Sequence, residues 1–152
     1  QVGSSAASDV YKRQVLSKLA VGVNLADIIE INPIYFDFDK ANIRPDAAIE
    51  LDKIVKVMAD YPGMVIELGS HTDCRGSDEY NLYLSDRRAK SSAAYIQERI
   101  DESERIYGKG FGETTPNIPS PNGCGTLSED EHQLNRRTEF IIVELGGANT
   151  RD

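Results

Sequence analysis

Apolar residues recur at three- and four-residue intervals in two long stretches of the chain. Residues 47–59 carry one such stripe, and residues 77–100 carry a second. The stripes consist of Leu51, Ile54, Val55 and Met58 in the first stretch, and of Leu84, Ala89, Tyr95, Ile96 and Ile100 in the second. This spacing predicts two amphipathic helices, each with one buried face. Pro45 suits the first turn of the first helix, and Ser77 suits the N-cap of the second.

Four short apolar runs are typical of β-strands. The runs are residues 34–38, 64–69, 105–107 and 138–143. They are rich in Ile, Val, Phe or Tyr and are bounded by Pro, Gly or charged residues. A long loop at 113–129 contains several Pro and Gly residues, and a short helix is predicted around 128–134, before the last strand.

The predicted order of elements is therefore β-α-β-α-β-(short α)-β. Two amphipathic helices on one face of a small sheet make a two-layer α/β sandwich of the α+β class, with a mixed parallel and antiparallel sheet. The connection through the first helix is expected to be a right-handed crossover between parallel strands.

The two ends of the chain fall outside this pattern. Residues 1–14, QVGSSAASDVYKRQ, are small and polar, and the string SSAASDVYKRQ resembles a translated sequencing-adapter remnant. We expect a disordered, non-native segment at 1–14, a lead-in at 15–29, one domain at 30–145 and a disordered tail at 146–152. The first segment lacks the basic and apolar regions of a signal peptide, so any signal peptide, lipid anchor or preceding domain would lie upstream of it.

Composition restricts the class of function. A chain of 152 residues is long enough for one domain with a hydrophobic core. Its 17 basic and 25 acidic residues give a net charge of −8, so electrostatic binding to nucleic acid or to anionic lipid is not expected. No apolar run approaches the ~18 residues of a transmembrane helix, so direct membrane insertion is not expected either.

The densest polar cluster is Ser-His-Thr-Asp-Cys-Arg-Gly at 70–76, directly after the second predicted strand. Ligand sites in α/β sheets commonly lie where strands end beside helix starts. Arg88, on the predicted helix that follows, can approach the loop that carries Asp73. An acid and a guanidinium separated by a ligand-sized gap suit a zwitterion, because one binds an ammonium group and the other a carboxylate. On the pattern alone, a plain Asp73–Arg88 salt bridge is the favoured interpretation.

Other residue types give weaker signals. His71 has no nucleophile at a spacing typical of catalysis, so a hydrogen-bonded structural histidine is favoured. His71 and His132 lack the spacing of metal ligands, and Cys74 has no His placed to activate it. The glycine-rich run 108–112 lacks the Lys and Ser/Thr of a phosphate loop, so flexible turns are expected there. No cofactor and no metal site is predicted.

Four strings of the sequence together resemble the OmpA-like peptidoglycan-binding domain. They are YFDFDK-x-NIRP at 35–45, GSHTDCRGSDEYNLYLSDRRA at 69–89, YGKGFGE-x-x-P at 107–116 and NRRTEF at 135–140. The TD-x-x-G…N-x-x-LS-x-x-RA pattern is the most specific part, and the resemblance spans about residues 30–145. The cysteine within the motif is similar to that of large OmpA-family proteins of Bacteroidetes-type bacteria.

The resemblance implies a binding module rather than an enzyme, and it reverses the interpretation of the acid and the arginine. In the family these positions hold the meso-diaminopimelate side chain of the peptidoglycan stem peptide. Asp73 would then take the ammonium group, and Arg88 the carboxylate. The other contacts that the resemblance implies are Phe38 and Asp39 on the first strand, Thr72, Arg75, Asn81 and Leu84 along the pocket, and Arg136 at the head of the last strand.

The implied function is to tether the outer membrane, or a larger envelope protein, to the cell wall from the periplasmic face of the outer membrane. The alternative is the cell-wall anchor of a stator-type or other multi-domain envelope assembly. A peptidoglycan hydrolase is disfavoured, because no carboxylate pair or metal triad is placed for it. Because the periplasm is oxidising, Cys74 and Cys124 are predicted to form a disulfide that folds the Pro- and Gly-rich insertion over the pocket rim.

Overall fold

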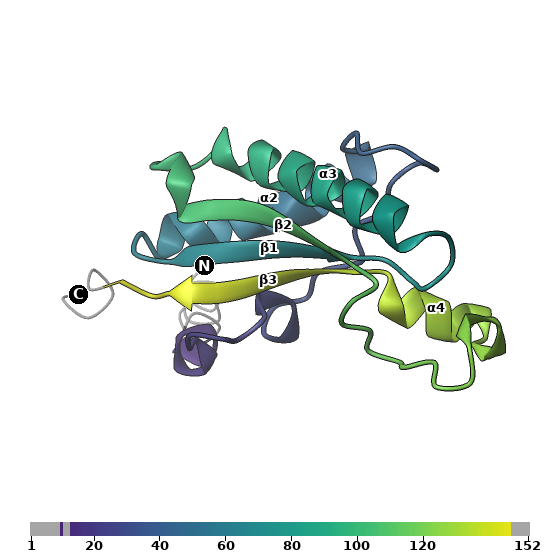
Figure 1. Ribbon diagram of the computed structural model, residues 1–152. Coiled ribbons are helices and arrows are strands. Elements are labelled where there is room, and N and C mark those ends of the chain that lie inside the picture. The colour runs from purple at the N-terminus through teal and green to yellow at the C-terminus, as the bar shows by residue number, and fades with distance from the viewer. Residues whose placement is uncertain (1–9, 11–12, 147–152) are drawn as a thin grey trace.

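The computed structural model describes residues 10 and 13–146, which form one mixed sheet with helices (Figure 1). The strands are β1 (Val65–His71), β2 (Ile106–Gly112) and β3 (Arg137–Glu144). The central strand, β1, runs parallel to β2 and antiparallel to β3, which gives the order β2-β1-β3. The predicted α+β class and mixed sheet are confirmed.

Two long helices and several short ones accompany the sheet. They are α2 (Pro45–Asp60), α3 (Asp78–Gln97) and α4 (Glu129–Asn135), with 3-10 turns at Leu25–Asp27, Ser103–Arg105 and Cys124–Thr126. As predicted, α2 has Pro45 in its first turn, and the Ser77 side chain caps α3 by accepting a hydrogen bond from the Tyr80 amide. Within the described part of the chain, none of the helices combines the length and the apolarity needed to cross a bilayer.

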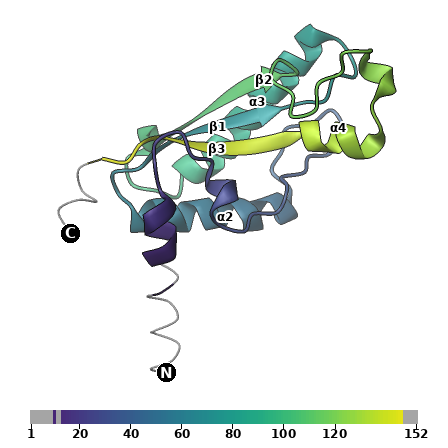
Figure 2. The same ribbon diagram turned by 90° about the horizontal axis from the view of Figure 1, so that it is seen from below.

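The core lies between one face of the sheet and the helices α2 and α3 (Figures 1 and 2). Alternate residues of each strand point toward the helices, as the two-residue period of a strand requires. The fully buried apolar residues of the described chain include Leu25 of the lead-in, Leu51, Ile54 and Met58 of α2, Met64 before β1, Ala89 and Ile96 of α3, and Ile66, Leu68, Ile106, Phe140 and Ile142 of the sheet. The stripes predicted from the sequence are therefore the faces that the helices bury.

Strand β2 is longer than the sequence predicted, because its glycines are strand residues and not flexible turns. A Cβ on Gly108 would lie 2.3 Å from the carbonyl oxygen of Ala89, and one on Gly110 would lie 2.2 Å from the amide nitrogen of Asp86. The backbone of α3 thus lies directly on the backbone of β2, and a side chain at either glycine would separate the two elements.

The prediction of a first strand at 34–38 is wrong. Another segment occupies the outer edge of β3: the Gly22 amide donates to the Ile142 carbonyl (2.7 Å), and the Ile142 amide donates to the Val23 carbonyl (2.9 Å). Residues 34–38 are irregular instead, so the predicted crossover through α2 does not form. The lead-in at 15–29 is correspondingly more structured than expected, with a short helix at 13–18 and a fully buried Leu25. Most of the segments predicted to be disordered, 1–14 and 146–152, lie outside the described residues.

Candidate functional site

A cleft of about 840 Å³ opens beside the carboxyl end of β1. Its walls come from the irregular segment 34–39, the loop after β1, the first turns of α3, and the junction of α4 with β3. All nine residues that the sequence singled out for binding line it: Phe38, Asp39, Thr72, Asp73, Arg75, Asn81, Leu84, Arg88 and Arg136. The structure therefore gathers residues from four separate parts of the chain around one space.

Asp73 is the buried carboxylate of the cleft. Both of its oxygens accept hydrogen bonds from guanidinium groups: Oδ1 from Arg75 Nε (3.2 Å), and Oδ2 from Arg75 Nη2 (2.8 Å) and Arg136 Nη1 (2.5 Å). The Arg75 amide also donates to Oδ1 (2.9 Å). Burial alone would raise the pKa of Asp73, but these bonds, above all those from Arg75, hold it at about 2. Asp73 is therefore ionised at every physiological pH.

The same two arginines reach a second carboxylate on the insertion. Glu129, in the first turn of α4, accepts hydrogen bonds from Arg75 Nη1 (3.1 Å) and from Arg136 Nη2 (2.7 Å). Arg136 Nη2 also donates to the side-chain oxygen of Gln133 (2.6 Å). The carboxylates and guanidiniums alternate across this wall, so each charge lies against opposite ones and α4 is tied to the loop after β1.

Arg88 lies on the other side of the cleft, and it makes no salt bridge with Asp73; the plain ion pair favoured by the pattern alone is wrong. Its Nε donates to the Lys40 carbonyl (2.8 Å), its Nη2 donates to the Asp37 carbonyl (3.2 Å), and its guanidinium lies 4.9 Å from the centre of the Phe36 ring. Burial lowers its pKa, and nearby Asp39 acts in the opposite direction. Arg88 therefore fixes the turn at 37–40, and among the described residues its Nη1 has no hydrogen-bond partner.

The turn that Arg88 holds presents two candidate residues at the mouth of the cleft. Phe38 is 93% exposed, and Asp39 has a φ of 63°, in the left-handed region that non-glycine residues rarely adopt. An aromatic side chain left this open at the edge of a cleft is available to cover a bound molecule.

Three further candidate residues form the floor of the cleft and the loop after β1. Leu84 is buried, and Asn81 positions the loop by donating from Nδ2 to the Arg75 carbonyl (3.0 Å) and to Glu113 Oε1 (2.8 Å). The Thr72 hydroxyl is buried and has no hydrogen-bond partner within the described structure. This hydroxyl therefore has an unused hydrogen-bonding capacity beside the cleft.

The disulfide between Cys74 and Cys124 is confirmed, with a Cα–Cα distance of 5.8 Å. It joins the loop after β1 to the 3-10 turn of the insertion. Asn135 gives a second link, since its side chain accepts from the Ile118 amide (2.7 Å) and donates to the Ile118 carbonyl (3.0 Å). The insertion is therefore fastened to the loop after β1 by the disulfide and to the last turn of α4 by Asn135, although none of residues 113–128 lines the cleft itself.

His71 and Arg137 also line the cleft, although neither is among the nine residues predicted to bind. His71 stacks on Phe111, with ring centres 4.9 Å apart, and its Nε2 lies 3.1 Å from Glu139 Oε1. The hydrogen bonds that Glu139 accepts from His71 and from Arg137 hold its pKa at about 2, against the effect of burial. The favoured reading of His71 as a hydrogen-bonded structural histidine agrees with these contacts. Arg137 and Glu139 lie two residues apart on β3, so they share one face of the strand. This spacing is the signal in the sequence that could have placed them together.

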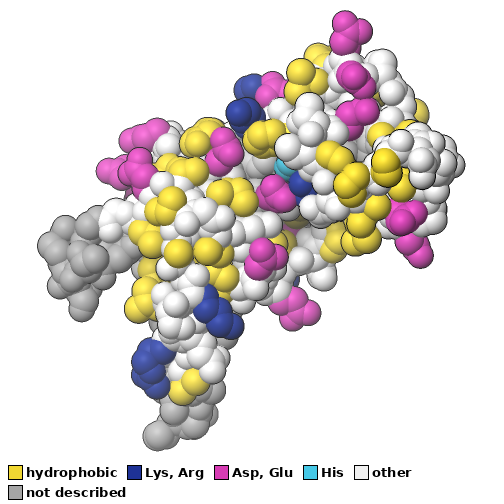
Figure 3. All heavy atoms as spheres, turned by 60° about the horizontal axis from the view of Figure 1, so that its bottom comes forward, with side chains coloured by type: hydrophobic (Ala, Val, Ile, Leu, Met, Phe, Trp, Pro, Cys, Tyr) yellow, Lys and Arg dark blue, Asp and Glu magenta, His cyan; other side chains and the backbone are white. Residues whose placement is uncertain are grey.

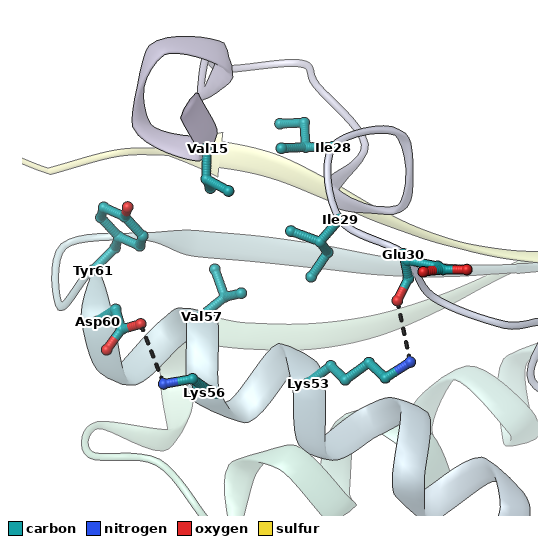
Figure 4. Close-up of a pocket in the computed structure, with 9 residues that line it drawn as sticks. All are labelled: Val15, Ile28, Ile29, Glu30, Lys53, Lys56, Val57, Asp60 and Tyr61. Atoms are coloured by element: carbon teal, nitrogen blue, oxygen red, sulfur yellow. Dashed lines mark hydrogen bonds and ion pairs between the residues drawn. The ribbon is translucent and has the colours of Figure 1, made fainter. Parts of the chain in front are cut away.

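A second pocket, of about 580 Å³, lies between the lead-in segment and α2. Val15, Ile29 and Val57 point toward one another across it, while a Lys53 hydrogen bond to the Glu30 carbonyl (3.1 Å) lies at its edge (Figure 4). Its two lysines are already engaged, Lys53 by the Glu30 carbonyl and Lys56 by Asp60. The cleft at the end of β1, where charged groups of both signs converge, is therefore the candidate binding site.

The charge of the cleft differs from that of the whole chain. Acidic side chains are scattered over the face shown in Figure 3, where Lys and Arg occur at only a few places. Four arginines nevertheless line the cleft: Arg75, Arg88, Arg136 and Arg137. Together with the ionised Asp73 they give the cleft groups of both signs, which suits a ligand that carries both signs itself.

The sequence profile of the OmpA family matches residues 35–123, and the chain belongs to this family. A relative from Gloeobacter violaceus, named photosystem I P700 chlorophyll a apoprotein A2, is 39% identical over 109 residues, which cover 72% of this chain and 12% of the relative. The peptidoglycan-associated lipoprotein of Rhizobium meliloti is 37% identical over 83 residues, or 55% of this chain and 47% of the relative. Across the first curated relatives, which include proteins named outer membrane porin F and outer membrane protein A, the chain spans 12–53% of their lengths.

Solved structures agree on the fold. The crystal structure of the peptidoglycan-associated lipoprotein from Burkholderia pseudomallei superimposes with a TM-score of 0.59 and 23% identity, over 72% of this chain and 87% of that one. The predicted family is thus confirmed by the match of residues 35–123.

Proposed function

We propose that this chain is a peptidoglycan-binding domain that recognises the diaminopimelate of the stem peptide and so tethers an envelope component to the cell wall. The observation that carries the proposal is the arrangement of the cleft, with an ionised carboxylate on one wall and Arg88 on the other. Diaminopimelate ends in an ammonium and a carboxylate on one carbon, so it offers each wall a group of opposite charge. The relatives named peptidoglycan-associated lipoprotein support this choice of ligand.

In the proposed complex, Asp73 receives the ammonium group. Arg75 now occupies that position, but its side chain is half exposed, whereas that of Asp73 is 9% exposed. Displacement of Arg75 into solvent would leave Arg136 in place, so the carboxylate would remain paired throughout. The pKa of about 2 keeps Asp73 charged and able to attract the ligand's ammonium.

Arg88 receives the carboxylate in this proposal. Its Nη1 is available, while Nε and Nη2 fix the direction of the guanidinium by their bonds to the 37–40 turn. The exposed Phe38 would cover the aliphatic part of the ligand, and the Thr72 hydroxyl would meet one of its polar groups. The proposed location is the periplasmic face of the outer membrane, which the outer-membrane names among the relatives support.

Sedimentation with purified peptidoglycan tests the proposal. We expect Arg88→Ala and Asp73→Asn to lose binding, since removal of one partner from a desolvated charge pair costs about 2–5 kcal/mol, enough to abolish a micromolar interaction. The matched control is Arg87→Ala, because Arg87 is exposed and packs on Tyr83 outside the cleft. Undiminished sedimentation of folded Arg88→Ala and Asp73→Asn would overturn the proposal.

Competition by free amino acids tests the ligand itself. Diaminopimelate should compete with peptidoglycan, whereas lysine should compete less, because it carries the ammonium group but leaves Arg88 without a carboxylate. Equal competition by both compounds, measured by calorimetry, would contradict the role proposed for Arg88.

A further inference from the structure

Behind the rim of the cleft, three side chains from three separate elements converge. Cys74 comes from the loop after β1, Cys124 from the 3-10 turn of the insertion, and His132 from α4. Their sulfur and ring-nitrogen atoms all lie within 4.8 Å of one another. The spacing along the chain, 50 residues between the cysteines, could not indicate such a group.

The histidine of this group is buried, and one of its ring nitrogens has no hydrogen-bond partner in the described structure. His132 is 5% exposed, and its Nδ1 is buried with no hydrogen-bond partner in the described structure. A buried imidazole nitrogen without a partner is costly, so it calls for an explanation such as a ligand that is held only in another state of the protein.

We propose that reduction of the Cys74–Cys124 disulfide turns this group into a site for a soft cation such as Zn²⁺. In the reduction, a dithiol donates two electrons and two protons: the S–S bond breaks, two thiols form, and the dithiol becomes a disulfide. Zn²⁺ then displaces the two thiol protons and takes two thiolates and one neutral imidazole as ligands.

The geometry suits this coordination. Zinc with Zn–S bonds of about 2.3 Å and Zn–N bonds of about 2.0–2.1 Å holds tetrahedral ligand atoms about 3.5–3.8 Å apart. The three atoms already lie within 4.8 Å of one another, so modest adjustments of side chains are enough once the sulfurs separate. Three protein ligands leave the fourth position to water.

The consequence is that the rim keeps a cross-link in both redox states. The disulfide joins the loop after β1 to the insertion when the protein is oxidised, and the metal joins the same two segments, and α4 as well, when it is reduced. Asp73 and Arg75 flank Cys74 in the sequence, so the loop that lines the cleft stays anchored in either case.

Cobalt titration of the full chain, with Co²⁺ as the spectroscopic substitute for Zn²⁺, tests the proposal. The reductant is a phosphine, which becomes a phosphine oxide as water supplies the oxygen and the protons. We expect the reduced protein to bind one Co²⁺ with a thiolate-to-cobalt charge-transfer band that one equivalent of Zn²⁺ removes. The oxidised protein is the matched control and should give no band. Absence of the band from the reduced protein would overturn the proposal.

The role of the histidine is tested separately. Loss of a residue that only hydrogen-bonds to a metal ligand costs about 10–100-fold in metal affinity. Loss of the ligand itself should cost no less, so His132→Ala should weaken Co²⁺ binding by at least ~10-fold. Cadmium NMR of the reduced wild-type protein, whose shift reflects the number of sulfur ligands, should indicate two sulfurs and one nitrogen even if that variant fails to fold. Unchanged affinity in folded His132→Ala, or a shift that indicates sulfur ligands alone, would remove His132 from the site.

Discussion

The contact of α3 with β2 and the rim of the cleft are built in different ways. Where α3 crosses β2, Gly108 and Gly110 allow backbone to lie against backbone. Three α3 side chains also bond to the β2 backbone there: Asp86 to the Gly110 amide, Ser85 to the Gly112 amide and Gln97 to the Ile106 carbonyl. At the rim, the insertion carries few buried side chains and is fastened by a disulfide, by ion pairs from Arg75 and Arg136 to Glu129, and by the bonds of Asn135. Close backbone packing with local hydrogen bonds therefore holds the first region, whereas a few separate links hold the second.

This difference teaches how each region can change. Glycine has no smaller alternative, so every substitution at Gly108 or Gly110 adds volume where no space exists. A rim with several links can lose one and keep its position, so its sequence is freer to vary. The binding surface thus adjoins one region that tolerates little change and one that tolerates more.

Removal of the disulfide is expected to have the largest effect. The bond closes a loop with a sequence separation of 50 residues, and the entropy of that loop in the unfolded chain corresponds to about 4 kcal/mol. The double variant Cys74→Ser/Cys124→Ser should lose up to this amount in urea unfolding, while its native core keeps its near-ultraviolet circular dichroism. A loss below about 1 kcal/mol would mean that the other links of the rim carry most of the constraint.

A side chain in the helix–strand contact should come next. Gly110→Ala places a Cβ 2.2 Å from the Asp86 amide nitrogen and 2.4 Å from its Cα, so the backbone of α3 has to move. We expect a loss of about 3 kcal/mol in the free energy of unfolding, at the upper end for overpacked sites.

The control for this variant comes from the rim. A Cβ on Gly125 would meet no atom within 4 Å, so Gly125→Ala should leave the free energy of unfolding nearly unchanged. Similar losses in the two variants, measured side by side in urea, would contradict the contrast between the regions.

Acidification should weaken the rim through Asp73. Its pKa falls from the ordinary 3.8 to about 2 on folding, so its contribution to stability is complete above about pH 4 and is lost as the pH falls toward 2. The shift corresponds to about 2 kcal/mol. In chemical unfolding between pH 5 and 2, Asp73→Asn should be less stable at pH 5 and show a shallower decline. Parallel curves for the two proteins would contradict this role of Asp73.

The smallest effects are expected from removal of the two helix caps, and the two variants should differ in how they unfold. Ser77 caps α3, and Ser128 caps α4 in a reciprocal capping box with Glu131. Each cap is worth about 1 kcal/mol. Ser77→Ala should lower the global free energy of unfolding by that amount, whereas Ser128→Ala should chiefly speed hydrogen exchange of the α4 amides, because a short helix at the rim can open alone. Equal losses of global unfolding free energy in the two variants would show that α4 unfolds together with α3 and the sheet.

The sequence predicts the helices well, because a stripe of apolar residues at helical spacing has to be buried somewhere. It fails for β2 because the reason for Gly108 and Gly110 lies in α3, about twenty residues earlier in the chain. It fails at 34–38 because strand propensity counts for little when another segment already occupies the available edge of the sheet.

Prediction of the site was uneven for a related reason. The resemblance to the family found nine residues that line the cleft, but not their pairing. Helical spacing favoured Arg88 as the partner of Asp73, while the real partners are Arg75, two residues away, and Arg136, 63 residues away. Only the fold brings Arg136 to the loop, since β3 lies beside β1.

The short pairing of residues 22–24 with β3 has a consequence for self-association. An unpaired strand edge offers its amides and carbonyls to any other strand, including that of a second copy of the same chain. Here Gly22 and Val23 occupy both the carbonyl and the amide of Ile142 at that edge. The lead-in thereby protects this edge of β3 from pairing with another strand. A fragment that began at residue 30 would expose the edge and should aggregate more readily.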